Sequence, residues 1–594
     1  MRSLIRHPTL LPVTLTLLVA VVGCGPAPHS KPPPRPPPTD IRQAWFEEVT
    51  ADSGVRFTHD PDARGHYRLP EHIGSGLALF DFNNDQRLDL YLVQNGGPDS
   101  TSTNRLYAQQ PDGSFLDVSA GSGLDITGWG MGAYAGDVNN DGWTDLLVTE
   151  YGTARLFLNQ AGTSFLEVTQ PAGLINPRWA TAASFLDYDR DGWLDLVVGN
   201  YVDFDPTHEC YDEVGRRDYC GLDRVPPTIT RLFHNEGPHP LARPPGLEIA
   251  VPRFTDVTVP SGLVHHPGQA LGVACLDLNG DHWPDILLAD DMLPNRVFIN
   301  RQNGTFTEEG AARGLAYTAL GQVAADMGIA LGDVNRNGLF DIFITHLTSE
   351  FHNLWIHHPQ GLFQDKTAAA GLTDLSPRTT GFGTVMGDFD LDGAPDIALV
   401  NGHIKRSPAP PENAPAQFLT TPFWQPYAQP AQLLRNDGTG RFEDISSLNA
   451  NFSHPRMVGR GLAAGDLDND GNLDLVSTCI AGPARLFRNV AGDGRHWLSV
   501  RGILPAHGGR DAIGAEIHLL VQGQTQVRLL QPALGYLSNQ DPRVHFGLGA
   551  STTYDGITVV WPDGQSESFP RGAANRHLIL QQGSGTAIPT STTP

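Results

Sequence analysis

The sequence predicts an all-β protein, a seven-bladed β-propeller followed by a small C-terminal β-sandwich-like domain. Three observations predict this fold. A nine-residue pattern rich in Asp and Asn occurs seven times, and apolar stretches of strand length flank each copy. The composition, with 65 Gly and 47 Pro among 594 residues, suits many short strands joined by turns. At this length several domains or a closed repeat array are expected.

The N-terminus is expected to be a targeting segment, with a lipoprotein signal peptide over residues 1–23. Arg2 and Arg6 precede an apolar stretch that is too short to span a bilayer comfortably. The stretch ends in small residues before Cys24 and resembles a bacterial lipobox, so Cys24 is expected to carry a lipid. An ordinary signal peptide with an incidental cysteine is the alternative. Residues 24–44 are rich in proline and are expected to form an extended tether to the outer membrane or cell surface.

The net charge of −25 argues against nucleic acid as a partner, because nucleic-acid binding needs a basic surface. So many carboxylates require counter-charges, and metal cations are the natural candidates.

The repeated pattern places oxygen-bearing side chains at positions 1, 3, 5 and 9. The seven copies consist of Asp81, Asn83, Asp85 and Asp89; Asp137, Asn139, Asp141 and Asp145; Asp187, Asp189, Asp191 and Asp195; Asp277, Asn279, Asp281 and Asp285; Asp333, Asn335, Asn337 and Asp341; Asp388, Asp390, Asp392 and Asp396; and Asp466, Asp468, Asp470 and Asp474.

Each repeat reads as four short strands, which is the organisation of a propeller blade. Apolar strands precede and follow the Asp-rich loop, a third strand ends in a motif such as Leu-Phe-Leu-Asn, and a fourth begins with Phe. The seventh repeat lacks its own fourth strand, whereas an unassigned strand-like segment, Phe46 to Thr50, precedes the first repeat. We therefore expect this segment to complete the seventh blade and close a ring over residues 45–490.

These motifs resemble the FG-GAP or VCBS repeat family, whose members form seven-bladed propellers such as the head of integrin α chains. Downstream, the segments 510–515, 546–549 and 561–564 look like an ASPIC/UnbV domain, which we place at residues 491–582, followed by a disordered tail at 583–594. The combination is similar to the cartilage acidic protein family and its bacterial relatives. The resemblance implies an integrin α-like propeller, and it implies no established activity for the C-terminal domain.

The loops offer only oxygen ligands, which suits Ca²⁺, a hard cation that takes six to eight oxygens. About seven calcium sites are expected, and the resemblance implies that position 7 adds a backbone carbonyl. Asp, Asn and Gly are also good turn formers, but an acid at position 9 in every copy favours calcium. The loop at Asp333 has two carboxylates and is expected to bind most weakly. Zinc is not expected, because the loops offer neither His nor Cys at ligand spacing.

The favoured function is recognition of a protein or glycan ligand. The two largest insertions, residues 201–230 and 402–431, follow second strands and should lie on the face opposite the calcium loops. Their aromatic residues either anchor a partner or pack the insertions internally: Tyr201, Phe204, Tyr211, Tyr219, Phe418, Phe423, Trp424 and Tyr427. Cys210 and Cys220 are expected to form a disulfide that pins one insertion in an oxidising compartment.

The alternative is a polysaccharide hydrolase or lyase. In that case His346, Asp290 and Glu150, which belong to a polar series directly after the second strands, would supply acid and base groups. No nucleophile elbow, zincin motif or phosphate loop supports an enzyme.

Overall fold

The structure is a computed structural model that describes residues 43–62, 65–212, 214–222, 225–238, 250–406, 422–492 and 494–589. The expected signal peptide, the lipidation site Cys24 and nearly all of the tether lie outside these residues. The described residues belong to one unit, Thr39–Pro594.

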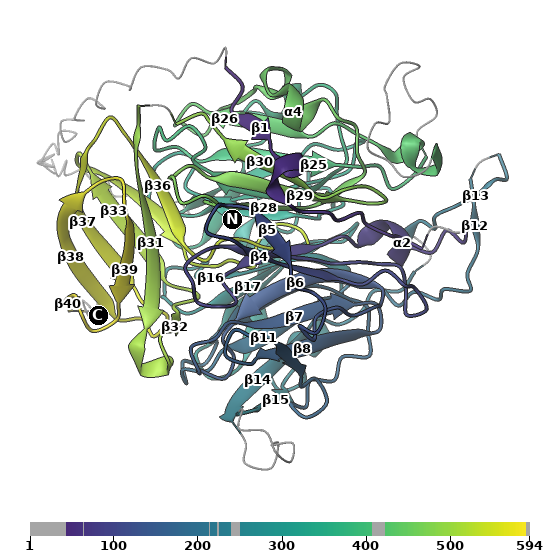
Figure 1. The fold of residues 1–594 in the computed structure, drawn as a ribbon, viewed down its shortest axis with the longest axis horizontal. Coiled ribbons are helices and arrows are strands. Elements are labelled where there is room, and N and C mark those ends of the chain that lie inside the picture. Colours follow the sequence, from purple (N-terminus) through teal and green to yellow (C-terminus); the bar gives the residue numbers. More distant parts are fainter. Residues whose placement is uncertain are drawn as a thin grey trace, which may run out of the picture. The chain divides into compact units, whose positions relative to one another are not determined.

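Seven antiparallel four-stranded units form the first part of the chain, one for each Asp-rich loop (Figure 1). Their strands, in sheet order, are β2 (Leu77–Phe80), β3 (Asp89–Leu92), β4 (Arg105–Gln109), β5 (Phe115–Asp117); β6 (Gly130–Gly136), β7 (Asp145–Glu150), β8 (Thr153–Asn159), β9 (Phe165–Glu167); β10 (Ala180–Leu186), β11 (Asp195–Asn200), β14 (Arg231–Pro238), β15 (Pro252–Asp256); β16 (Ala270–Leu276), β17 (Asp285–Asp290), β18 (Arg296–Asn300), β19 (Phe306–Glu308); β20 (Ile329–Gly332), β21 (Asp341–Ile344), β22 (Asn353–His358), β23 (Leu362–Asp365); β24 (Gly381–Gly387), β25 (Asp396–Asn401), β26 (Gln432–Asn436), β27 (Phe442–Asp444); and β28 (Gly459–Gly465), β29 (Asp474–Cys479), β30 (Arg485–Asn489), β1 (Phe46–Glu48).

The N-terminal strand completes the seventh unit, which confirms the predicted clasp. Strand β1 pairs antiparallel with β30, with Phe46 opposite Asn489. The Phe46 side chain is fully buried, and its ring lies 5.5 Å from that of Phe389 in the sixth unit. The first strands of consecutive units contact one another all the way round, and β28 contacts β2.

The apolar cores lie between neighbouring units. One buried cluster joins Phe80 and Tyr91 of the first unit to Leu146 and Phe157 of the second. The first and second strands are buried along almost their whole length, which explains why they read as continuous apolar runs in the sequence.

Two sheets form the C-terminal part. One contains β32 (Arg510–Asp511), β31 (His496–Leu504), β36 (Val544–Gly549) and β39 (His577–Gln581), and the other contains β34 (Gln524–Leu529), β33 (Glu516–Val521), β37 (Thr553–Val560), β38 (Ser566–Ala573) and β40 (Thr586–Ile588). Val500 and Phe546 of the first sheet share one apolar cluster with Leu519 and Ile557 of the second. Strand β40 pairs with β38, so the expectation of a disordered tail from residue 583 is wrong for these residues.

Helices in the described residues are short. They are α1 (Thr50–Ser53), α2 (Pro70–Ile73), α3 (Gly310–Arg313), α4 (Ala450–Ser453) and the 3-10 turns η3 (Leu263–His265), η4 (Leu372–Asp374), η5 (Pro422–Tyr427), η6 (Ser446–Leu448) and η7 (Pro505–His507). None of these helices has the length and apolar character that a membrane crossing requires.

A segment of the C-terminal part, residues 531–541, enters the ring of first strands, and we call it the plug. Its strand β35 (Ser538–Asn539) pairs in parallel with β2. Gly535 exchanges backbone hydrogen bonds with Ile329 in the fifth unit. The backbones approach so closely that a Cβ at Gly76 would lie 2.3 Å from the Leu537 carbonyl oxygen, so only glycine fits there.

Candidate functional site

All seven Asp-rich loops have the same local conformation. Position 4 has a positive φ in every copy, at Asn84, Asn140, Arg190, Gly280, Arg336, Leu391 and Asn469. Position 6 does too, and this includes Gln86 and His282, which stand where the other copies have Gly. The side chain of position 1 accepts a hydrogen bond from the position 6 N–H in each loop, over 2.6–3.1 Å.

The position 9 aspartates bind the backbone, a role that the sequence reasoning missed. In every copy one carboxylate oxygen accepts the N–H of position 2 at 3.0–3.2 Å. The other oxygen accepts an N–H of the third strand at 2.8 Å. The invariant acid therefore has a structural reason that is independent of any metal, and we call this arrangement the carboxylate clamp.

A second repeated contact joins neighbouring units. The amide at the end of the third strand donates to the position 2 carbonyl of the preceding unit, over 2.7–2.9 Å. This occurs at six of the seven junctions, from Gln109, Asn159, Asn235, Asn300, Asn436 and Asn489. The Asn that ends each Leu-Phe-x-Asn motif is thus an inter-unit tie.

The loops of the third, sixth and seventh units bring their acids together most closely. In each, three carboxylates place oxygens within 4.8 Å of one another: Asp187, Asp189 and Asp191; Asp388, Asp390 and Asp396; and Asp466, Asp468 and Asp474. These are the three loops that contain four carboxylates each.

The third and seventh loops also leave buried acceptors unused. Oδ1 of Asp187 and Oδ1 of Asp466 are buried and have no hydrogen-bond partner. In the fifth loop, by contrast, Oδ1 of Asp333 accepts the N–H of Asn337 at 2.9 Å. Unsatisfied buried carboxylate oxygens are costly, so these two loops fit an oxygen-seeking cation best. In the sixth loop Asp390 instead pairs with Arg495 and Arg435 at 3.2 and 3.5 Å.

His234, from the third strand, adds a nitrogen beside the third loop, a neighbour that the pattern itself does not contain. Its Nδ1 lies 3.2 Å from Asp195 and 3.4 Å from Asp189. The hydrogen bond to Asp195 raises the pKa of His234 to about 9. The signal in the sequence was its place directly before the Asn that ends the third strand.

The C-terminal part contacts the loop face of the ring. Arg510 donates to the Gly192 carbonyl at 3.2 Å, and Arg543 donates to the Asp466 carbonyl at 2.9 Å. The N–H of Gly547 donates to the Asp388 carboxylate at 3.1 Å. The C-terminal part therefore covers part of the loop face and leaves a cavity of about 420 Å³ between itself and the first two loops, whereas the other end of the ring carries a larger one.

The polar residues that follow the second strands are buried at that other end, and do not form an open surface. They are Gln94, Glu150, Asn200, Asp290, His346, Asn401 and Cys479. Asp290 pairs with Arg296 through two contacts of 2.7 Å, and His346 lies 2.7 Å from Asp326. Glu150 is buried beside Arg155 at 3.4 Å. The candidate acid and base groups are therefore held in internal ion pairs.

Most of the insertion aromatics pack internally, whereas Tyr211 is 60% exposed and Tyr201 lines a cavity. Tyr219, Trp424 and Tyr427 belong to one buried cluster, and Trp424 is 1% exposed. Tyr427 donates to Asp218 at 2.9 Å, which joins the two insertions. Phe418 lies outside the described residues. Of the two alternatives, internal packing therefore holds for Trp424 and Tyr219.

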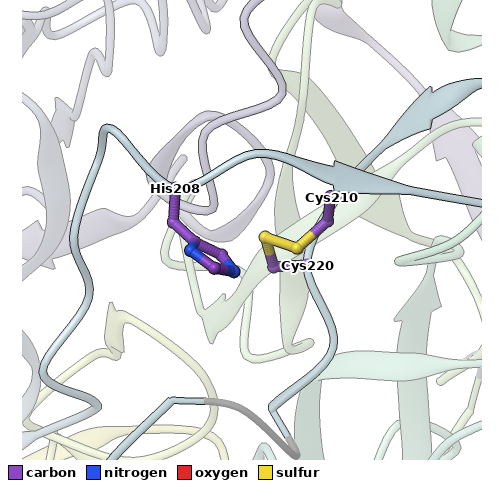
Figure 2. A group of neighbouring side chains, drawn as sticks. All are labelled: His208, Cys210 and Cys220. Atoms are coloured by element: carbon purple, nitrogen blue, oxygen red, sulfur yellow. A yellow bond between two sulfur atoms is a disulfide. The ribbon is translucent and has the colours of Figure 1, made fainter.

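The expected disulfide is formed within the first insertion (Figure 2). The sulfur atoms of Cys210 and Cys220 lie 2.15 Å apart, close to the hairpin of β12 (Cys210–Tyr211) and β13 (Arg217–Asp218). His208 lies beside the disulfide, but oxidised sulfurs are not thiolate ligands, so the three side chains do not form a metal site. Cys275 and Cys479 are free and buried.

A cavity of about 770 Å³ opens at the end of the ring opposite the loops. Residues that follow second strands line it, among them Tyr201, Asp291, Thr348 and His403. Buried apolar side chains, including Ile73 and Phe382, form its floor. The plug supports this floor, because Tyr536 donates to the Ile73 carbonyl at 3.1 Å and its ring lies 4.9 Å from Phe382.

Comparison with known families agrees with the repeat pattern. A model of the FG-GAP-like repeat matches residues 81–148, 137–198, 277–344 and 423–477, and the ASPIC and UnbV model matches residues 506–587. The chain belongs to the FG-GAP-repeat proteins with a C-terminal ASPIC/UnbV domain. The matched spans contain six of the seven loops, with the loop at Asp388 outside them.

Curated relatives of this FG-GAP and ASPIC/UnbV protein include the cartilage acidic protein 1 of Homo sapiens. It is 28% identical over 333 residues, which are 55% of this chain and 46% of that protein. Cartilage acidic protein 1 of Xenopus tropicalis is 26% identical over 358 residues, 58% of this chain and 50% of that protein. The chain thus spans about half the length of these relatives.

Solved structures overlap only loosely. An Agrocybe aegerita lectin that recognises non-reducing terminal N-acetylglucosamine is 13% identical over 71% of this chain and 90% of its own, with a TM-score of 0.36. A rhamnogalacturonan lyase of Bacillus licheniformis is 10% identical over 70% of this chain and 72% of its own, with a TM-score of 0.35. At these scores the overlaps carry no argument about function.

Proposed function

We propose that this protein is an exported recognition module: a seven-bladed, calcium-binding propeller that binds a protein or glycan ligand, with a C-terminal β-sandwich on its loop face. The observation that carries the proposal is the cavity at the free end of the ring. It is concave, it has an apolar floor, and rigid strands with a disulfide-bonded insertion frame it, as is usual for ligand sites.

Calcium has a stabilising role in this proposal. The converging carboxylates of the third and seventh loops repel one another, and an ion that binds only the folded loop would stabilise it by mass action. Their acids and the position 7 carbonyls would hold the ion. All seven loops are proposed sites, with the third and seventh binding most tightly and the fifth, which has two carboxylates, most weakly.

Calcium titration by calorimetry, with elemental analysis of the dialysed protein, tests the metal sites. We expect about seven ions per chain. Asp189→Asn and Asp468→Asn should each weaken one tight site, while Asp555→Asn, an exposed acid on β37, serves as the charge-matched control. Tight binding that both loop variants leave unchanged would contradict the assignment.

Recognition is tested by screening glycan and protein arrays with and without calcium, then blocking the cavity. Ser349 lines the cavity and is exposed, so Ser349→Trp should obstruct the opening without disturbing the core. Thr525→Trp on β34 is the control for an added surface ring. Binding of an array ligand should be lost only in the first variant, at an unchanged melting temperature. If both variants bind the array ligand equally well, the cavity is not the recognition site.

A lipid anchor on Cys24 is part of the proposal. It rests on the lipobox-like sequence and places the module on the outer membrane or cell surface. Metabolic labelling with a fatty acid should mark the wild-type protein and not Cys24→Ser.

Within the described residues no observation favours the hydrolase or lyase alternative, because Asp291 is the only acidic residue that lines the cavity. Glycoside hydrolysis ordinarily needs a pair of carboxyl groups.

A further inference from the structure

We infer that the cavity binds a small organic anion, a molecule that joins a carboxylate, sulfate or phosphate group to a ring-sized apolar body. This inference deepens the proposed recognition function by naming the class of ligand, and it rests on that function.

The charges around the cavity are opposite in sign to those of the protein as a whole. Four cationic side chains line it: Arg378, Lys405, Arg406 and Arg456. The chain itself has a net charge of −25. A group of cations in a strongly acidic protein concentrates positive potential at one place, which attracts anions.

These cations form no ion pair in the part of the chain that the structure describes, although Tyr427 and, at longer range, Asp218 raise the pKa of Arg406. No carboxylate oxygen there lies within the 4.0 Å of an ion pair from any of the four. Arg378 stacks over the ring of Phe351 at 4.2 Å, and Arg456 donates to the Ala428 carbonyl at 3.1 Å. Their guanidinium groups are held in place but their charges are not neutralised locally.

A fifth cation lies directly beneath the floor. Arg460 is 0% exposed, and its guanidinium stacks 3.8 Å from the ring centre of Phe382. It donates to the carbonyls of His72 and Gly459, each at 2.7 Å, while its Nη2 atom has no partner. Phe382 and His72 both line the cavity. A buried guanidinium with an unused donor and no carboxylate beside it is costly, and a bound anion would supply the missing counter-charge.

The acid that lines the cavity is itself engaged. Asp291 is 7% exposed and accepts a hydrogen bond from Tyr201 at 2.6 Å. Its carboxylate is therefore bound to the Tyr201 hydroxyl, and it does not form an ion pair with any of the four cations that line the cavity.

The apolar floor explains why the ligand needs more than a charge. Leu69, Ile73, Leu271 and Met327 line the cavity and are buried, and together with Phe382 they offer a surface on which an uncharged ring or chain can pack. A volume of about 770 Å³ lies in the range of small-molecule sites. Inorganic anions alone would leave this surface uncovered.

The test uses two fluorescent probes with the same ring system on the full exported chain without its lipid. One probe, 8-anilinonaphthalene-1-sulfonate, is an anion, and N-phenyl-1-naphthylamine is its uncharged counterpart. We expect one site per chain, which binds the anionic probe at least about tenfold more tightly than the uncharged probe. Its affinity should fall as the salt concentration rises. Glucuronate, sulfate and inorganic phosphate, used as separate competitors, identify which anionic group displaces the probe best.

Two double variants isolate the charge. The double variant Arg378→Gln and Lys405→Gln removes two exposed cations at the opening of the cavity. It should lower the affinity for the anionic probe about tenfold and leave the affinity for the neutral probe unchanged. Arg571→Gln with Arg576→Gln removes two exposed cations from the C-terminal part and should change neither.

The outcomes separate this inference from the function on which it rests. Equal affinity for the two probes, or an anionic probe that the first double variant binds normally, overturns the anion inference. If the neutral probe still binds in the cavity and Ser349→Trp blocks it, the recognition function stands. If neither probe binds, the anion inference fails, while the recognition function is judged separately by array binding and its loss in Ser349→Trp.

Discussion

The carboxylate clamp gives a direct test of why an acid stands at position 9 of every repeat. The fourth loop is suitable because Asp285 and Asp281 lie in the same loop but do different things. Asp285 is 0% exposed and accepts the N–H groups of Leu278 and Asn300 at 3.0 and 2.8 Å. Asp281 is partly exposed and accepts the N–H of Trp283 at 2.9 Å.

Asp285→Asn keeps one acceptor and turns the other into a donor that faces a buried N–H. That N–H then has no partner, which costs about 1–3 kcal/mol. We therefore expect a loss of about 2 kcal/mol in the free energy of unfolding even without calcium. Asp281→Asn retains its acceptor for Trp283. Its other oxygen accepts the side-chain amides of Asn279 and Gln302, which water can satisfy instead because they are partly exposed, so without calcium the variant should stay within about 0.5 kcal/mol of the wild type.

Urea denaturation in a calcium chelator, repeated with calcium, measures both variants. The experiment belongs at pH 8.5 or above, because burial raises the pKa of Asp285 to about 8 and the wild-type carboxyl must be ionised. With calcium, Asp281→Asn should lose part of the metal-dependent stabilisation. If Asp285→Asn were as harmless as Asp281→Asn in the chelator, the clamp would not be structural and the acid would be present for the metal alone.

Three further outcomes follow from the contacts. Asn235→Leu removes the tie to Val138 of the preceding unit together with the contacts to the Leu194 carbonyl and the Gly237 N–H, and should lower the free energy of unfolding by at least about 1–2 kcal/mol in urea denaturation. No loss would mean that the ties are incidental. Tyr536→Ala should lower the free energy of unfolding by about 3–5 kcal/mol, because it empties the space beside Phe382, whereas Tyr536→Phe should lower it by about 1 kcal/mol. Similar losses in the two variants would mean that packing of the Tyr536 side chain against Phe382 is unimportant. Affinity for the anionic probe should rise as pH falls from 8 to 6, because burial raises the pKa of Asp291 to about 7 and its protonation removes the negative charge of the cavity wall. Asp291→Asn should abolish that pH dependence, and an unchanged dependence would assign it to another group.

The repeats and the clasp were accessible from the sequence because both depend on local patterns. Alternation between an Asp-rich loop and apolar runs fixes where strands begin and end, and a fourth strand missing from the last repeat can be found by its own motif at Phe46.

The position 9 acids show where the same reasoning goes too far. Seven identical acids were interpreted as metal ligands, yet each is also required by two backbone donors. A pattern records that a residue type is needed and cannot say which of two physical reasons requires it. Only the unpartnered oxygens of Asp187 and Asp466, seen in three dimensions, separate the loops that most need a cation from the rest.

Recognition residues were misplaced because exposure is a tertiary property. An aromatic on a long insertion, such as Trp424, looks like a partner contact until another insertion is found to cover it. The cationic lining of the cavity was missed for the opposite reason: Arg378, Lys405 and Arg456 come from separate repeats and share no motif. Neither local periodicity nor spacing could have brought them together.

The plug gives a physical reason for the C-terminal domain to accompany the repeats. Its segment runs from the loop face through the ring to the floor of the cavity, where Tyr536 supports Phe382, and Phe382 in turn lies against Arg460. The same domain places Arg510 and Arg543 among the Asp-rich loops. Residues 531–541 connect the two ends of the ring. A shift of the C-terminal domain on the loops would therefore also displace the residues under the cavity. If calcium binds the loops and a ligand binds the cavity, as we propose, both would stabilise the contacts of the plug, so each should raise the affinity for the other.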